Sequence, residues 1–131
     1  PLAITAALNN NDFSLYGTDY NTPDGTCIRD YIHVLDLVEA HILALNKLQK
    51  DNGGFFYNVG RGIGYSNKEV IEMVKKISGK DLKVKVMGRR PGDSEVLIAA
   101  AAKIQKELGF KPRYSDLETI VSTAFNWHKR I

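Results

Sequence analysis

Residues 20–34 read Tyr20-Asn21-Thr22-Pro23-Asp24-Gly25-Thr26-Cys27-Ile28-Arg29-Asp30-Tyr31-Ile32-His33-Val34, a polar turn followed by a β-rich segment. The Pro-Asp-Gly tripeptide is a turn signal, because proline fixes φ and glycine accepts positive φ. The segment after it, residues 28–34, favours a strand. Yet Arg29, Asp30 and His33 lie within this strand, and ionisable groups are costly to bury without partners.

Two interpretations of this charged segment stay open from the residues alone. In the first, Arg29 pairs with Asp30, and the backbone satisfies the ring of His33. In the second, the planar guanidinium of Arg29 is held at a strand edge. There it can grip a phosphate or a carboxylate through two parallel hydrogen bonds.

Helices and strands alternate on both sides of this stretch. Before it, residues 2–8 predict the end of a helix and residues 13–16 predict a short strand. After it, residues 35–50 predict a long amphipathic helix, with His41 packed near its buried edge. The apolar stripe that this helix is expected to bury consists of Leu37, Val38, Ile42, Leu45 and Leu48.

A glycine-rich segment, Gly60-Arg61-Gly62-Ile63-Gly64, follows a predicted buried strand at residues 55–59 and precedes a helix, as a dinucleotide-binding loop does. The third position of that fingerprint needs a glycine for contact between helix and strand, but Tyr65 stands there. We therefore interpret the segment as a strand-to-helix connection with permissive backbone angles. A further strand is predicted over residues 82–87.

Capping boxes of the form Ser-x-x-Glu predict the starts of two more helices. The first, at residues 66–69, opens a helix that ends at a glycine, and the second, at residues 115–118, opens a final helix. A shorter helix is predicted over residues 99–108 and also closes at a glycine. The aromatic side chains of the final helix, Phe125 and Trp127, are expected in the core.

Alternation of strands and helices indicates the α/β class, with parallel pairing favoured where a helix connects two strands. Apart from the helix end at residues 2–8, the predicted elements are four helices and four short strands, which do not close a core of their own. Some apolar faces are therefore expected to pack on sequence outside these residues. The start at Pro1, inside an apolar segment, likewise suggests a chain cut from something longer.

Composition excludes several classes of protein. Apolar residues make up 44% and charged residues 25% of the chain, as in globular proteins. The net charge of +3 is too small, and the lysines are too dispersed, to predict nucleic-acid binding. No apolar run approaches the ~20 residues of a membrane span, and no secretory signal is expected. The single Cys27 has no metal-ligand spacing around it, so a reducing cytoplasm and no metal site are expected.

The second basic candidate site is the loop Arg89-Arg90-Pro91-Gly92-Asp93. Its proline and glycine restrict the backbone, so the arginines project in a fixed geometry. Asp93 can orient an arginine or accept hydrogen bonds from ligand hydroxyls; a solvated surface turn is the alternative. Together with Arg29, this loop would suit an anionic sugar phosphate, but the sequence alone does not show that the two segments converge.

Residues 20–34 closely resemble a signature of the UDP-glucose 4-epimerases, which belong to the extended short-chain dehydrogenase/reductase family. Further blocks recur in that family in the same order and with similar spacing: Tyr57-Asn58-Val59-Gly60, residues 62–66, residues 89–93 and Leu108-Gly109-Phe110-Lys111-Pro112. The resemblance covers essentially the whole chain. It implies that residues 1–131 are the C-terminal, substrate-binding part, with elements that complete the Rossmann-type domain.

The resemblance also implies a reaction, the interconversion of UDP-glucose and UDP-galactose through a 4-keto intermediate. Bound NAD takes up the hydride and returns it, while a tyrosine takes the proton of the sugar 4-hydroxyl. In the family, the equivalents of Arg29 and Arg90 hold the UDP diphosphate, and the equivalent of Asp93 contacts the ribose. The equivalents of three further residues lie along the uridine, namely Ser14, Leu15 and Tyr16.

Leu97 falls where the family varies a residue beside the hexose. A bulky aromatic side chain there would exclude an N-acetyl group, whereas leucine leaves more room. The resemblance therefore implies that the parent enzyme accepts UDP-N-acetyl sugars to some degree.

The glycine-rich NAD loop and the catalytic Tyr-x-x-x-Lys of the family do not occur in residues 1–131. No residue is therefore assigned as catalytic or as an NAD ligand. The fragment is expected to supply UDP-sugar binding, to be inactive alone and to come from a homodimeric parent. Two alternatives stay open, another sugar-nucleotide epimerase, dehydratase or decarboxylase and a non-catalytic UDP-sugar-binding module.

Overall fold

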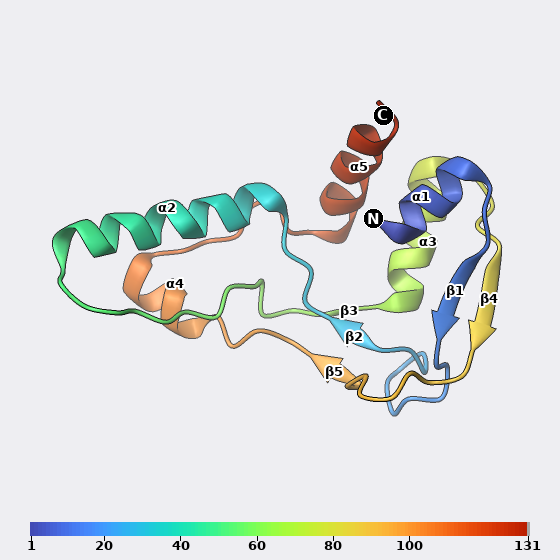
Figure 1. Ribbon diagram of the computed structural model, residues 1–131, viewed down its shortest axis with the longest axis horizontal. Coiled ribbons are helices and arrows are strands. Elements are labelled where there is room, and N and C mark those ends of the chain that lie inside the picture. Colours follow the sequence, from blue (N-terminus) through green and yellow to red (C-terminus); the bar gives the residue numbers. More distant parts are fainter. Residues whose placement is uncertain (131) are drawn as a thin grey trace.

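The computed structural model describes residues 1–130, which form an elongated molecule (Figure 1). The helices are α1 (Leu2–Asn9), α2 (Val34–Lys50), α3 (Asn67–Ser78), α4 (Ala102–Leu108) and α5 (Leu117–His128). The strands are β1 (Phe13–Tyr16), β2 (Ile28–Arg29), β3 (Tyr65–Ser66), β4 (Val84–Met87) and β5 (Val96–Leu97). Helices α2 and α4 lie at one end and α1, α3 and α5 at the other, with β2, β3 and β5 between them.

The strands form two small sheets. β1 pairs with β4 in parallel, with Tyr16 opposite Met87. β2 is the central strand of the other sheet, antiparallel to β3 and parallel to β5, and Arg29 lies opposite both Tyr65 and Leu97. Parallel strands end at the same edge of a sheet, so the segments that follow β1 and β4 meet at one edge.

Two apolar clusters lie at the two ends of the molecule. The larger cluster buries side chains from α1, β1, α3 and α5, among them Ile4 and Val74. The smaller cluster joins α2 to α4 and buries Ala40 and Phe110. Residues 1–130 therefore have no single central core, and the short strands of the middle sheet connect two separately packed ends.

Several helix signals are confirmed. The hydroxyl of Ser66 accepts a hydrogen bond from the backbone N–H of Glu69, and the Glu69 carboxylate accepts one from the backbone N–H of Ser66. This is the predicted capping box. Gly79 and Gly109 end α3 and α4 with φ of 65° and 68°, which glycine adopts at no steric cost. The elements predicted over residues 2–8, 13–16 and 35–50 are each confirmed to within one residue.

The predicted capping box at residues 115–118 is wrong. Asp116 caps α5, because its carboxylate accepts the backbone N–H of Thr119 at 2.9 Å. Ser115 is buried, and its hydroxyl donates a hydrogen bond to the carboxylate of Asp36. A side chain committed to a distant partner cannot cap the helix that follows it.

The buried strand predicted at residues 55–59 is also wrong. The segment forms no strand, and the side chain of Phe56 is 84% exposed. A strand needs a neighbouring strand to hydrogen-bond its backbone, and an apolar composition does not provide one. No strand within residues 1–130 pairs with this segment. The strands predicted at residues 28–34 and 82–87 are shorter than expected and consist of β2 and β4.

Helix α2 does not bury its predicted apolar stripe. The apolar side chain that it buries fully is Ala40, and His41, expected to be packed, is exposed. Trp127 of α5 is 64% exposed, whereas Phe125 packs partly against the larger cluster. Periodicity shows which face of a helix is apolar but not what covers that face. The exposed members of the α2 stripe are Val38, Ile42, Leu45 and Leu48.

A buried aspartate connects the start of α2 to the segment that leads into α5. The carboxylate of Asp36 is inaccessible to solvent and accepts the backbone N–H groups of Arg113 and Tyr114, both at 2.9 Å, and the hydroxyl of Ser115. Burial alone would raise the pKa of Asp36. The hydrogen bonds from Ser115, Arg113 and Tyr114 outweigh burial and lower this pKa below its ordinary value.

Replacing Asp36 by Asn is expected to lower the free energy of unfolding at pH 7 by about 2–4 kcal/mol, because a neutral amide accepts these hydrogen bonds less well. A carboxyl group with a lowered folded-state pKa stabilises the fold above its unfolded pKa and loses this effect as the pH falls through the folded pKa. The difference between the variant and the unchanged chain should therefore shrink below about pH 4.

Urea unfolding at pH 7 and at pH 3 measures both effects. The matched control is Asp81→Asn at an exposed aspartate, which should change the free energy of unfolding by less than about 0.5 kcal/mol. Equal losses in the two variants, or an undiminished difference at pH 3, would contradict the role assigned to Asp36.

Candidate functional site

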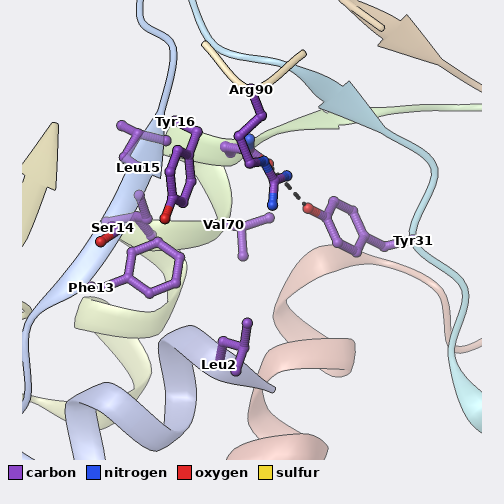
Figure 2. A pocket seen from close by; sticks show the side chains of 10 residues that line it. Leu2, Phe13, Ser14, Leu15, Tyr16, Tyr31, Val70 and Arg90 are labelled. Carbon is purple, nitrogen blue, oxygen red and sulfur yellow. Dashed lines mark hydrogen bonds between the residues drawn. The ribbon is translucent and has the colours of Figure 1, made fainter. Parts of the chain in front are cut away.

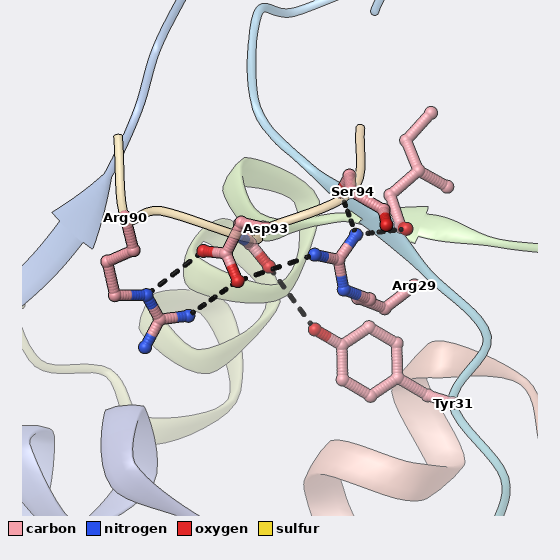
Figure 3. Close-up of polar contacts among 7 residues, drawn as sticks. Arg29, Tyr31, Arg90, Asp93 and Ser94 are labelled. Atoms are coloured by element: carbon pink, nitrogen blue, oxygen red, sulfur yellow. Dashed lines mark hydrogen bonds and ion pairs between the residues drawn. The ribbon is translucent and has the colours of Figure 1, made fainter. Parts of the chain in front are cut away.

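Strand β2 and the loop after β4 bring Arg29, Arg90 and Asp93 together (Figure 3). Arg90 Nε lies 3.0 Å from Asp93 Oδ2, and Arg90 Nη2 lies 3.4 Å from Asp93 Oδ1. Arg29 Nη2 lies 4.0 Å from the same Oδ1. One carboxylate thus faces two guanidinium groups from segments far apart in the sequence.

The two guanidinium groups are held to different degrees. Arg29 Nη1 donates to the carbonyl oxygens of Ile28, at 2.9 Å, and of Ser94, at 2.8 Å, and this side chain is 25% exposed. Arg90 is 60% exposed and lies over the ring of Tyr16, 4.8 Å from its centroid. Arg29 is therefore fixed by backbone atoms, whereas Arg90 is free to adjust to a ligand.

Arg29, Arg90 and Asp93 together carry an excess of positive charge. Two guanidinium groups face one carboxylate, Asp93, and each guanidinium has more N–H donors than this carboxylate can accept. An exposed ion pair such as Arg90–Asp93 contributes little to stability, so Arg90 can exchange its partner for a ligand at small cost. Such a group can bind an anion that carries several charged oxygens, such as a diphosphate.

Two cavities adjoin the arginines. The smaller, of about 200 Å³, lies between β1 and the start of α3, and Arg90 lines it (Figure 2). Its lining includes the three predicted β1 residues Ser14, Leu15 and Tyr16. The larger, of about 660 Å³, is lined by Arg29 and Leu97 among others. Leu97 lies on β5, opposite Arg29, and is 62% exposed.

Asp30 has a role that the sequence analysis missed. Its Oδ1 accepts the backbone N–H of Arg61 at 3.0 Å, and its Oδ2 accepts those of Gly62, at 2.9 Å, and Ala99, at 3.2 Å. The carboxylate therefore does not pair with Arg29, as the first interpretation of the charged segment expected. The signal available in the sequence was the run Gly60-Arg61-Gly62, because glycine allows another group to approach the backbone closely. In the structure a Cβ at Gly60 would lie only 2.5 Å from Asp30 Oδ2.

The glycine-rich segment does not fit the diphosphate of a dinucleotide. A phosphate-binding loop needs free backbone N–H groups, but those of Arg61 and Gly62 are bound to Asp30. The segment leads through β3 into α3, and Gly62 has φ of 77°. The backbone N–H groups of Arg61 and Gly62 are therefore not available to a diphosphate.

His33 is buried and serves the structure. Its Nδ1 accepts the backbone N–H of Leu35 and so caps α2, and its Nε2 lies 2.9 Å from the hydroxyl of Thr123. Within residues 1–130, no three His, Cys, Asp or Glu side chains gather into a group that could hold a metal ion. The same residues contain no helix that is long and apolar enough to cross a membrane.

Comparison with known proteins places the chain in a family. The family model described as GDP-mannose 4,6 dehydratase matches residues 2–123. The UDP-glucose 4-epimerase of Halalkalibacterium halodurans is 45% identical over 130 residues, which are 98% of this chain and 39% of that protein.

Solved structures agree with this placement. The UDP-Glc/GlcNAc 4-epimerase of Campylobacter jejuni matches 98% of this chain and 39% of its own, with a TM-score of 0.89 and 48% identity. The UDP-glucose 4-epimerase of Bifidobacterium longum, solved in complex with NAD+ and UDP, matches 98% of this chain and 38% of its own, with a TM-score of 0.88 and 38% identity. The chain thus spans about two fifths of the length of these relatives. Its α/β fold matches part of their structures, and it belongs to the UDP-glucose 4-epimerase family.

Proposed function

We propose that residues 1–131 are the C-terminal, UDP-sugar-binding part of a UDP-glucose 4-epimerase. The observation that carries this proposal is the convergence of Arg29 and Arg90 on the carboxylate of Asp93, between two cavities. A sugar nucleotide has a matching layout, with two phosphates in the middle, a nucleoside on one side and a sugar on the other.

In this proposal the diphosphate lies between the two guanidinium groups and takes the place that Asp93 now occupies beside Arg90. The freed carboxylate of Asp93 then accepts hydrogen bonds from the ribose hydroxyls. The uridine enters the smaller cavity along β1, and the hexose enters the larger cavity beside Leu97. Arg29 and Arg90 thus form a phosphate clamp around the diphosphate. Arg29, held by two carbonyl groups, is the fixed half of this clamp.

The hydride chemistry of this family needs NAD, and the proposal assigns NAD and the proton-transferring tyrosine to the part of the relatives that this chain does not span. The exposed apolar stripe of α2 supports this division, because a stripe of that kind suits packing against further protein. The residues of this chain bind and orient the substrate.

Arg29→Ala and Arg90→Ala are each expected to weaken UDP binding by at least about tenfold, or about 1.4 kcal/mol, because each removes charge-assisted hydrogen bonds to phosphate. Calorimetric titration with UDP and with uridine measures this loss. Uridine lacks phosphates and should bind equally weakly to both variants and to the unchanged chain. Arg113→Ala is the control, since this arginine pairs with Glu39 away from the site. Full UDP affinity in both arginine variants would refute the clamp.

A chimera tests the activity. Residues 1–131 replace the matching 39% of the Halalkalibacterium halodurans epimerase. The chimera is expected to interconvert UDP-glucose and UDP-galactose, with the products separated by chromatography, and Arg90→Ala in the chimera should reduce the rate. A chimera that binds UDP-glucose without converting it would indicate a non-catalytic binding module. A dehydrated or decarboxylated product would indicate a different sugar-nucleotide enzyme.

The same chimera tests the choice of sugar. Leu97 is exposed in the larger cavity, and the Campylobacter jejuni relative is described as a UDP-Glc/GlcNAc 4-epimerase. Leu97→Tyr is expected to lower turnover of UDP-N-acetylglucosamine at least about tenfold more than turnover of UDP-glucose, because the ring fills the space for the N-acetyl group. Leu97→Ile conserves volume and should change neither rate much. Equal losses for both sugars, or no N-acetyl turnover before substitution, would disprove this preference.

A further inference from the structure

Asn67 lines the smaller cavity and has no role in the clamp described above. It is the first residue of α3, and its backbone N–H donates to the carbonyl of Cys27 at 3.0 Å. The adjoining N–H groups of α3 are also used, that of Lys68 by the hydroxyl of Thr26 and that of Glu69 by the hydroxyl of Ser66. The donor that this end of α3 offers to a ligand is therefore the side chain of Asn67.

Tyr31 sets the orientation of the Asn67 carboxamide. Its hydroxyl donates a hydrogen bond to Asn67 Oδ1 at 3.4 Å. Burial raises the pKa of Tyr31 above its ordinary value, against the smaller opposing effect of the Arg29 charge. The hydroxyl therefore keeps at neutral pH the proton that it donates. Asn67 lines the cavity, and its NH2 group, which can only donate, is the part of the carboxamide that the bond to Tyr31 leaves unengaged.

The cavity suits a flat, partly apolar ring. Phe13, Tyr16 and Val70 contribute apolar surface to its lining, and Arg90 lies beside them near the phosphate clamp (Figure 2). Uracil and cytosine differ at two positions of their pairing edge. At C4 uracil carries a carbonyl acceptor and cytosine an amino donor, and at N3 uracil carries an N–H donor and cytosine an acceptor. A donor-only group placed against the C4 substituent pairs with uracil and leaves two donors facing each other with cytosine.

We propose that Asn67 is a specificity-determining residue, whose amide N–H groups select uracil over cytosine in an orientation that Tyr31 fixes. The inference rests on the proposed function, because its ligand is a nucleoside diphosphate. It goes beyond that function by assigning the choice of base to one side chain. The expected preference is a ratio of affinities, to which the phosphate clamp contributes equally for both nucleotides.

Calorimetric titration with UDP and CDP tests the proposal. The unchanged chain is expected to bind UDP at least about tenfold more tightly than CDP, which corresponds to about 1.4 kcal/mol. Asn67→Asp offers only acceptors and should lower this preference by at least about tenfold. Asn67→Val offers neither donor nor acceptor and should leave the two affinities within about threefold of each other.

Two further variants separate orientation from charge. Tyr31→Phe frees the carboxamide to turn its oxygen toward the cavity, so the preference for UDP should fall even if both nucleotides bind more weakly. Asn46→Asp adds the same charge as Asn67→Asp on an exposed position of α2 and should leave the preference unchanged.

The outcomes distinguish the two proposals. If neither UDP nor CDP binds to the unchanged chain, the proposed function fails, and this inference fails with it. If UDP and CDP bind equally well, or if both Asn67 variants keep the original preference, the role of Asn67 is refuted while the phosphate clamp stands. Thermal unfolding of each variant confirms that the compared proteins are folded.

Discussion

A buried backbone N–H group must find an acceptor, and in this chain aspartate carboxylates provide many of these acceptors. The strands are only two to four residues long, so ladder hydrogen bonds alone cannot hold the middle of the molecule. Asp24 accepts the backbone N–H of Thr26, Asp30 accepts those of three residues from two distant segments, and Asp36 accepts those of two residues ahead of α5. The carboxylates of Asp30 and Asp36 each take the place of two or three backbone hydrogen bonds and fix the loops that they contact.

The candidate site depends on this arrangement. Asp30 ties the glycine-rich segment and Ala99 to the end of β2, which keeps β5 in register beside that strand. This register places Leu97 opposite Arg29. It also keeps the loop that contains Arg90 and Asp93, which leads into β5, beside Arg29. An excess of positive charge then faces two cavities at a place where the backbone is already fixed. Preorganisation of this kind limits the entropy lost when a charged ligand binds.

Helix α2 shows how a helix can be positioned without burying its whole apolar face. His33 caps its start, Asp36 fixes its first turn, and Ala40 packs against the cluster shared with α4. Further along, its apolar side chains face outward. These side chains lie in a chain that spans about two fifths of its relatives' length. The polar contacts at one end therefore carry the positioning that a full hydrophobic interface provides in most helices.

The sequence by itself determined the elements whose signals are local. Helix periodicity, the Ser66 capping box and the glycine stops depend on neighbouring residues, so α1, α2 and α3 were predicted almost to the residue. For Arg29 and Arg90 the residue types left anion binding as one of two open interpretations, beside an ion pair with Asp30 for Arg29 and a solvated surface turn for Arg90. Only the tertiary structure decided which groups meet. It brought Arg29 to Asp93 rather than to Asp30, took Ser115 away from its helix, and left the α2 stripe uncovered. These outcomes depend on partners far away in the chain, and spacing along a sequence does not contain that information.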